Sequence, residues 1–408
     1  MDFTGRIEKK YMEICENKDI ARYLYFAGLG IYMLFALYDT TMYPDVGKLG
    51  LVIEVISVSL VALKMVLSDH FHMSEFFLIS GIVISGMLCY VVGKYIIVFL
   101  FLWIIVGSKG IPFREILSVY VILCGAVLML SFSGAGLSII ESVEVTDRGR
   151  ELFGIRLKSA NSFGIKNTTD FAAHIFFLYL SVFYLVGEKN KAVFSLFGFV
   201  LSFFLYYKTQ GRIDSGCLLI LSGLCILDRI IDAKKSVRLK EKWKKCWNIA
   251  GFISMPLAAA VSFAFCIMYH PSSVWNKVNK FSSSRISDGK RYFDTFPVNL
   301  FGRAVELVGQ GGTGRVEMMS GKEYLFFDIS YQMLLLRYGL LIFLIVVVAY
   351  MVIARKYKDD TNMMFCITLI SLNCMFAHHL LEIAYIPFIL ALFAEKSDSR
   401  TYMDKGSS

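Results

Sequence analysis

The sequence lacks the paired cysteines that would indicate a disulfide framework. Its nine cysteines are scattered singly, show no CxxC spacing and lie mostly inside apolar runs, as at Cys89, Cys124, Cys217, Cys225, Cys366 and Cys374. We interpret them as small buried hydrophobic residues. Residues 1–21 are polar and charged, without the short apolar core and small-residue cleavage site of a secretory leader. We therefore expect no cleavable signal peptide, and we expect the first apolar run to act as the insertion signal.

Familiar catalytic motifs are also missing. The segment Gly309–Gly314 has the glycine spacing of a phosphate-binding loop, but Arg315 and Val316 replace the lysine and hydroxyl residue that the motif requires. His378 and His379 are adjacent, so on a helix their side chains would point about 100° apart and would not chelate one metal ion together. We find no zinc-site spacing and no serine or cysteine triad, and we expect no metal and no other cofactor.

Long apolar runs are the dominant feature of the chain. Hydrophobic residues make up 56% of it, and the mean hydropathy is +0.60. Apolar runs of roughly 17 to 25 residues predict transmembrane helices, whereas a β-barrel would show short alternating strands. We therefore predict an all-α polytopic membrane protein, with residues 1–408 as a single integral membrane domain. About twelve spans are expected, at 22–38, 49–67, 75–92, 94–108, 116–133, 168–186, 192–208, 213–228, 248–268, 331–353, 363–378 and 383–395.

The distribution of lysine and arginine predicts how these spans are oriented. Short loops on one side of the predicted bundle are rich in basic residues, and the positive-inside rule places such loops in the cytoplasm; only the loop at 69–72 disagrees. Both termini and the basic loop 229–247 would then face the cytoplasm, and loops 134–167 and 269–330 would lie outside. We interpret 229–247 as a topological anchor against anionic lipid and not as a nucleic-acid site. No internal repeat relates the two halves, which disfavours transporters built on inverted repeats.

Arginines gather on the side predicted to be external. Arg150 and Arg156 lie in the first long loop, Arg212 begins a span, and Arg285 and Arg303 lie in the second long loop. Guanidinium groups bind phosphate oxygens with a bidentate geometry, so converging arginines outside the membrane suit a pyrophosphate. The alternative is that each arginine reaches lipid headgroups or pairs with a nearby carboxylate.

Three residues are candidates for proton transfer. Asp328, in Asp328-Ile329-Ser330-Tyr331, would serve either as a general base or as the N-cap of the following span. Glu382 follows His378 by four residues and His379 by three, so on a helix it would share a face with either. This group is either a polar cluster at a span end or part of a catalytic site.

Three short motifs, in this order, carry a resemblance to a known family. The first is Arg148-Gly149-Arg150 followed by Asn161-Ser162-Phe163-Gly164; the second is Thr209-Gln210-Gly211-Arg212; the third runs from Ser284-Arg285 through Asn299-Leu300-Phe301-Gly302 and Asp328-Ile329-Ser330-Tyr331 to Tyr338-Gly339. In this order and spacing the chain resembles the Wzy-type polysaccharide polymerases of capsule and O-antigen synthesis, which are related to the O-antigen ligases. Ala160 and Ser284 stand where the family usually has proline and glycine.

The resemblance implies a glycosyltransferase with a GT-C-like architecture in the bacterial cytoplasmic membrane. It would transfer a growing glycan from undecaprenyl pyrophosphate to a lipid-linked repeat unit on the outer face, without a metal, and would work beside a flippase and a chain-length regulator. Arg212 and Arg285 would hold the pyrophosphate, with Arg150, Arg156 and Arg303 as further candidates and Tyr331 as another substrate-binding residue. Asp328, or His378 with Glu382, would take the acceptor proton. An O-antigen ligase and a lipid-linked oligosaccharide flippase are the alternatives.

Overall fold

The structure is a computed structural model that describes residues 18–69, 71–146, 149–234, 236–309 and 324–396. Over these residues the chain is mostly helical, and seven helices are long and apolar enough to cross a membrane. The prediction of an all-α membrane protein is therefore confirmed at this level. The seven helices are Asp19–Asp39, Leu49–Ser68, Met73–Gly93, Phe113–Gly136, Thr168–Val186, Asn190–Thr209 and Val237–Met268.

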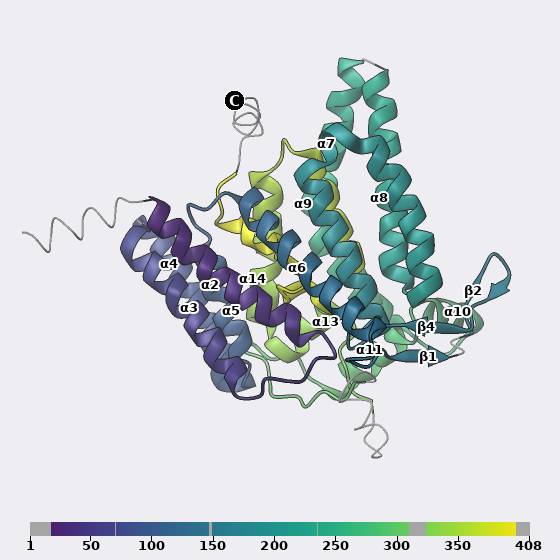
Figure 1. The fold of residues 1–408 in the computed structure, drawn as a ribbon, viewed down its shortest axis with the longest axis horizontal. Helices are drawn as coiled ribbons and strands as arrows, with labels where there is room; N and C mark the ends of the chain where they lie inside the picture. The colour runs from purple at the N-terminus through teal and green to yellow at the C-terminus, as the bar shows by residue number, and fades with distance from the viewer. Residues whose placement is uncertain (1–17, 70, 147–148, 235, 310–323, 397–408) are drawn as a thin grey trace, which may run out of the picture.

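The first five helices form one side of the molecule (Figure 1). They are α2 (Lys18–Asp39), α3 (Leu49–Ser68), α4 (Met73–Gly93), α5 (Ile96–Gly107) and α6 (Phe113–Gly136). Close approach of α2 and α3 depends on Gly28, where an added Cβ would lie 2.6 Å from the carbonyl oxygen of Ser57. The short helix α5 is nearly all buried, which fits its continuous apolar sequence.

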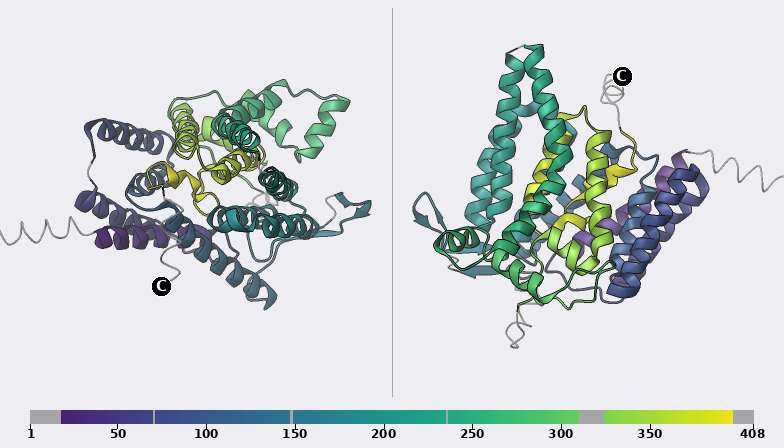
Figure 2. Two further views of the ribbon diagram at one scale, coloured as in Figure 1. Left: turned by 90° about the horizontal axis from the view of Figure 1, so that it is seen from above. Right: turned by 180° about the vertical axis from the view of Figure 1, so that it is seen from behind.

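The next three helices are long, and together they project beyond the rest of the bundle at one end (Figures 1 and 2). They are α7 (Thr168–Thr209), α8 (Arg212–Ala233) and α9 (Val237–Met268). The backbone of α7 is non-helical at Asn190, with φ −121° and ψ 26°, and there the helix divides into two arms. The arms pack against each other, because the ring of Tyr179 contacts those of Phe194 and Phe197. Both ends of α7 therefore lie at the same end of the molecule.

The predicted basic loop 229–247 is largely helical. Helix α8 continues to Ala233 and α9 already begins at Val237, capped by the Ser236 side chain, which accepts from the Leu239 N–H at 3.4 Å. The helices therefore extend into the predicted loop from both sides, and the placement of 229–247 outside the membrane stays a prediction. Polar and basic residues continue a helix readily where the helix leaves the apolar layer, so hydropathy places the end of a span and not the end of a helix.

The connections divide between two opposite ends of the bundle. At one end, the Tyr95 hydroxyl accepts from the Val305 N–H at 2.8 Å, and the Met42 N–H donates to the Gly164 carbonyl at 2.8 Å. At the other end, Lys109 pairs with Glu75 at 2.6 Å. The described residues of loops 134–167 and 269–330 lie at the first end, which is the alternation that the sequence prediction requires.

The two long loops have their own short elements. In the first, β1 (Glu144–Thr146) pairs with β4 (Ser159–Asn161), and β2 (Glu151–Leu152) pairs with β3 (Ile155–Arg156), both antiparallel. The second contains α10 (Ser273–Phe281) and α11 (Arg285–Thr295). The glycine-rich segment that contains Arg315 lies outside the described residues.

The C-terminal third departs most from the predicted spans. Its elements are α13 (Ser330–Gln332), the π-helix η1 (Met333–Tyr338), α14 (Leu340–Lys356), α15 (Thr361–Asn373) and the 3₁₀ helices η2 (His379–Leu381) and η3 (Pro387–Leu392). The span expected at 331–353 is interrupted at Gly339, where φ is 98° and an added Cβ would lie 2.3 Å from the backbone nitrogen of Gly302. The helix expected over 363–378 ends at Asn373.

The last predicted span, 383–395, is not an α-helix. It consists of turns and η3, yet it connects the two ends of the bundle, because Glu395 pairs with Ile111 and Phe113 at the end opposite His379. Proline at 387 restricts the residue before it to extended conformations, which opposes a continuous helix. Non-helical backbone is tolerated at membrane depth only when protein covers it, and here Leu390 and Ala391 are fully buried.

Side chains from neighbouring helices satisfy the carbonyls of this irregular segment. Tyr120 donates to the Tyr385 carbonyl at 2.8 Å, Ser108 to that of Leu390 at 3.0 Å and Lys356 to that of Ala391 at 2.9 Å. An unsatisfied carbonyl in hydrocarbon costs several kcal/mol. These donors therefore explain how an apolar, helix-like sequence is held in a different conformation.

Candidate functional site

A cavity of about 950 Å³ opens at the end of the bundle where the two long loops gather. Charged and polar side chains from five separate segments line it: Arg150, Lys166, Asn167, Thr169, Asp170, Arg212, Asp214, Ser282, Ser283, Ser284, Arg285, Asp288, Tyr324, Asp328, His378 and His379. It thus brings together Arg150, Arg212, Arg285, Asp328 and His378 from the candidates predicted by sequence.

Three helices begin at this cavity. They are α7, α8 and α11, and each carries an aspartate in its first turn that lines the cavity: Asp170, Asp214 and Asp288. The N-terminus of a helix carries roughly half a positive charge, so it favours acidic side chains and bound anions. The cavity is therefore rich in both signs of charge, with the positive side supplied by arginines and helix ends.

Two of the arginines that line the cavity, Arg150 and Arg212, contact the turn that joins α10 to α11, residues 280–285, and the third, Arg285, ends this turn. Arg212 donates to the carbonyls of Lys280 and Phe281, at 2.8 and 3.2 Å. Arg150 donates to the Ser283 hydroxyl at 2.9 Å, and Arg285 is the first residue of α11. We call residues 280–285 the arginine turn.

The arginine turn has a backbone that serine adopts only under constraint. Ser283 and Ser284 have φ of 57° and 68°, which is the left-handed region that glycine adopts freely. This explains why glycine suits the position that Ser284 occupies. The hydrogen bond from Arg150 to Ser283 helps to hold the turn in this conformation.

Arg285 is held on two sides. Its Nη1 donates to the Phe376 carbonyl, and its Nε lies 3.7 Å from Oδ1 of Asp328. These two partners fix the direction of the guanidinium group at the cavity wall. Lysine has a single ammonium group and would not reproduce both contacts in this geometry.

Asp328 does not cap a helix. The N-cap of α13 is Ile329, without a side-chain capping bond, and Asp328 instead accepts from the Tyr324 hydroxyl at 2.5 Å. The N-cap interpretation was therefore wrong, because the backbone turns into the helix one residue later than the motif suggests. Burial raises the pKa of Tyr324, and the nearby Asp328 charge raises it further, so Tyr324 stays a hydrogen-bond donor.

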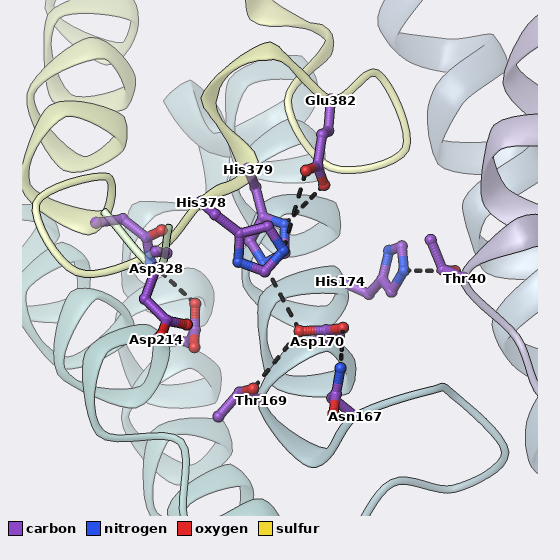
Figure 3. Close-up of polar contacts among 12 residues, drawn as sticks. Thr40, Asn167, Thr169, Asp170, His174, Asp214, Asp328, His378, His379 and Glu382 are labelled. Atoms are coloured by element: carbon purple, nitrogen blue, oxygen red, sulfur yellow. Dashed lines mark hydrogen bonds and ion pairs between the residues drawn. The ribbon is translucent and has the colours of Figure 1, made fainter. Parts of the chain in front are cut away.

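The histidine pair lies in an irregular segment and not in a helix. His378 precedes the 3₁₀ helix η2, and the rings of His378 and His379 approach to 4.0 Å between centroids. The argument that their side chains diverge was therefore wrong, because it assumed an α-helix. Figure 3 shows His378, His379 and Asp170 directed toward one another, with Glu382 behind the histidines.

Glu382 contacts His379 more closely than His378. Nδ1 of His379 lies 2.9 Å from Glu382 Oε2, whereas Nε2 of His378 lies 3.9 Å from Oε1. Nε2 of His379 then points to Asp170, whose Oδ1 is 3.9 Å away. A histidine held at one nitrogen by a carboxylate, with the other nitrogen directed into a cavity, is the arrangement of an oriented general base.

The surroundings set opposite proton affinities for the two histidines. Burial lowers the pKa of His378, and the neighbouring His379 lowers it further. Burial also acts to lower the pKa of His379, but Glu382, through its charge and its hydrogen bond, and the charges of Asp170 and Asp214 together outweigh it, so the pKa of His379 is raised. For Glu382 the effect of burial is outweighed by the two histidines, and its pKa is lowered. His379 is therefore the more basic of the pair.

Stacked rings fix the His379 ring in place. The ring of Tyr385 stacks on that of His379, with 3.7 Å between the ring centroids. The Tyr385 ring also stacks on the ring of His174, with 4.0 Å between the centroids. His174 in turn lies 2.9 Å from the Thr40 hydroxyl through its Nε2. Asp170 is positioned separately by Asn167, whose amide donates at 3.0 Å. The acid–base group is thus held by Thr40, which follows α2, by α7 and its N-cap Asn167, and by the 374–396 segment.

The same side chains have the donor types of a metal site. Asp170, His378 and His379 each offer one ligand atom, and these atoms lie within 4.8 Å of one another. Imidazole and carboxylate suit zinc and similar ions. The contact of His379 with Glu382 is equally that of a protonated pair. The geometry therefore permits either a proton or a cation between these groups.

Four of the predicted site residues lie outside the cavity wall. Tyr331 is fully buried and donates to the Ser371 carbonyl at 2.9 Å, so its role in the fold is to join α13 to α15. Arg303 stacks over Phe296 at 5.6 Å and donates to the Pro297 carbonyl. Arg156 lies on the exposed β3 strand. Glu382 reaches the cavity only through His379.

Sequence reasoning missed two aspartates. Asp170 lies two residues after the start of α7, and Asp214 two residues after Arg212, where Asn373 donates to it at 2.9 Å. A signal for Asp214 was present, because an ionisable residue inside an apolar span is by default a functional candidate. Asp170 belongs to Asn167-Thr168-Thr169-Asp170, which is typical of a helix start. The sequence therefore predicts a role at the start of the helix and does not indicate that Asp170 also lines the cavity.

Comparison with protein-family models, with curated proteins and with solved structures found no match.

Proposed function

We propose that this protein is a polysaccharide polymerase that transfers a growing glycan from undecaprenyl pyrophosphate to a lipid-linked repeat unit. The observation that carries the proposal is that Arg150, Arg212 and Arg285 line one cavity, two of them in contact with the turn that ends at the third, and that this cavity also holds His379 and Asp328. Anion-binding groups and a proton acceptor in one cavity, at the end of membrane-crossing helices, suit transfer from a pyrophosphate lipid.

The arginines would stabilise the leaving group. Cleavage of the bond between the anomeric carbon and the pyrophosphate oxygen leaves an electron pair, and so a further negative charge, on that oxygen. Fixed positive groups aimed at a charge that develops in the transition state are among the strongest contributions to catalysis. The starts of α8 and α11 add their partial positive charges on the same side.

The acid–base group would activate the acceptor. An acceptor hydroxyl oxygen attacks the anomeric carbon of the donor glycan, and its proton passes to Nε2 of His379. Glu382, at 2.9 Å from Nδ1, orients the ring and stabilises the imidazolium that forms. We do not assign this role to Asp328, because its carboxylate already accepts from Tyr324 and faces Arg285. With arginines supplying the positive charge, the reaction requires no metal.

The proposal includes a location and partners. The cavity would open on the outer face of the bacterial cytoplasmic membrane, with both termini in the cytoplasm, as the basic residues at the opposite end favour. Lipid-linked repeat units would arrive through a flippase, and a chain-length regulator would act on the product. A GT-C-like arrangement of the spans belongs to the same proposal.

Arg285→Lys tests the proposal directly. Lysine keeps the charge but loses the planar fork, and each charged hydrogen bond contributes roughly 1.5–3 kcal/mol. We expect a strain that lacks the native gene to make long polymer with the wild-type chain and only single repeats with Arg285→Lys, at equal protein level by blot. Arg156→Lys, on the exposed β3 strand, is the matched control and should restore normal ladders.

The same strains separate the alternative functions. Loss of polymer with single repeats still attached to the cell surface supports a polymerase. Loss of attachment of all glycan to its final acceptor would indicate a ligase, and accumulation of lipid-linked repeats on the cytoplasmic side would indicate a flippase. Wild-type ladders from Arg285→Lys would show that bidentate arginine contacts are not required.

A further inference from the structure

Helix α10 has an apolar face that the rest of the chain leaves uncovered. None of its residues is buried, and Val274 and Phe281 are 68% and 58% exposed. Val274, Val278 and Phe281 follow the i, i+4, i+7 spacing and lie on one face, whereas Asn276, Lys277, Asn279 and Lys280 occupy the rest of the circumference. A short, strongly amphipathic helix with lysines on its polar face is typical of a helix that lies at a membrane surface.

The helix is continuous with a surface that faces lipid. Residues near the end of the membrane-crossing helix α9 are also exposed and apolar, with Ile267 at 57% and Met268 at 62%. Trp275 packs α10 against this end of α9, because the Trp275 ring contacts the rings of Phe265 and Tyr269. Tryptophan and tyrosine prefer the membrane–water interface, where one side of the ring is apolar and the other is wet.

The C-terminal end of α10 is also part of the cavity. Phe281 lines the cavity, and Arg212 donates to the last carbonyls of the helix, at Lys280 and Phe281. In Figure 1, α10 lies at the same end as β1 and β4, beside the start of α8. One residue, Phe281, therefore belongs both to the exposed apolar face and to the cavity wall.

We propose that α10 lies in the membrane interface, with Val274, Val278 and Phe281 against acyl chains, and that it forms the edge over which an amphiphilic anion enters the cavity. The lysines reach toward lipid phosphates from the other side of the helix. The membrane location of α10 is independent of the proposed function. The role as an entry edge depends on that function, since it requires a substrate with an anionic head and a lipid tail.

Spin labels test the location without any measurement of activity. Nitroxides are placed at Val274→Cys and, on the opposite face about 200° away at 100° per residue, at Asn276→Cys, in a chain whose Cys15 and exposed Cys246 are replaced by alanine. In liposomes we expect the label at 274 to be relaxed more by oxygen and less by a water-soluble nickel chelate, and the label at 276 to show the reverse. Equal water exposure at both positions, or a label at 274 that neither reagent reaches because protein covers it, would overturn the proposal.

A second measurement tests the entry role. Val274→Asp should reduce transfer from a membrane-held undecaprenyl pyrophosphate donor and leave transfer from a short-chain, water-soluble pyrophosphate analogue unchanged. Equal loss with both donors would contradict the entry role while the label data still decide the location. Absence of transfer by the unaltered chain with either donor would instead count against the proposed function.

Discussion

Replacement of Glu382 by glutamine would test the acid–base group most sharply. Glutamine keeps the size of the side chain but removes the charge that faces Nδ1 of His379 at 2.9 Å. A hydrogen bond to a charged group contributes roughly 1.5–3 kcal/mol, and each 1.4 kcal/mol is about a factor of ten in rate. We therefore expect Glu382→Gln to slow glycan transfer by about 10- to 150-fold, since the imidazolium formed in the transition state loses its counter-charge.

The pH profile gives the same variant a second readout. His379 must be neutral to accept a proton, so activity falls as pH falls through its pKa. Glu382 raises that pKa above the ordinary histidine value, and removing the carboxylate should move the acidic limb of the profile to lower pH. A structural role for Glu382 would not move this limb.

The assay is the initial rate of glycan lengthening by the purified chain in lipid nanodiscs, from pH 5.5 to 8.5 (a range chosen to bracket histidine titration). Glu141→Gln is the matched control, because Glu141 is an exposed carboxylate in the loop after α6 that does not line the cavity. A Glu382→Gln chain with the wild-type rate and an unmoved acidic limb would refute the assignment of His379 as the base.

Three further outcomes are expected. Treatment with a strong chelator should leave transfer unchanged, because arginines supply the positive charge; loss of activity that zinc or manganese restores would assign a cation to Asp170 and the histidines. Tyr331→Phe should lower stability by roughly 1–3 kcal/mol, because the buried Ser371 carbonyl loses its donor, and should not change the rate per folded molecule. Cysteines at Lys158 and Lys240, in a chain otherwise free of reactive cysteines, should be labelled by an impermeant thiol reagent in intact cells at 158 only; labelling at 240 alone would reverse the proposed orientation.

Hydropathy predicted the fold well where the chain must face lipid. A helix exposed to hydrocarbon satisfies its own backbone and shows an apolar surface, so α2, α3, α4 and α6 could be predicted from the sequence. The segment 383–395 is as apolar as these helices, but its carbonyls are satisfied by Lys356, Ser108 and Tyr120. Nothing in the local sequence reveals donors that lie on other helices, and so a helix was predicted there.

The charged residues of the site could be predicted from the sequence, but the contacts that each of them makes could not. Arg212 and Arg285 could be predicted to lie on the same side of the membrane, because one begins a predicted span and the other lies in the long loop on that side. The closer approach of His379 to Glu382 could not, because it depends on the 3₁₀ turn that replaces the expected helix. Asp328 is the opposite case. Aspartate next to a helix start is a favoured capping residue, but the Asp328 side chain contacts Tyr324 and Arg285 instead of capping the helix.

The irregular segment 374–396 has a consequence for how the protein is made. It follows every membrane-crossing helix described, and it cannot enter a membrane alone, because its carbonyls depend on donors from α6, from α14 and from Ser108, the residue that follows α5. Its burial must therefore come after those helices have left the translocon and assembled. His378, His379 and Glu382 belong to this segment, whereas the arginine turn precedes it in the chain. A nascent chain would thus bring Arg150 and Arg212 to the arginine turn first, and it would fix the Arg285 side chain against Phe376 and gain its proton acceptor only when assembly of the bundle is complete.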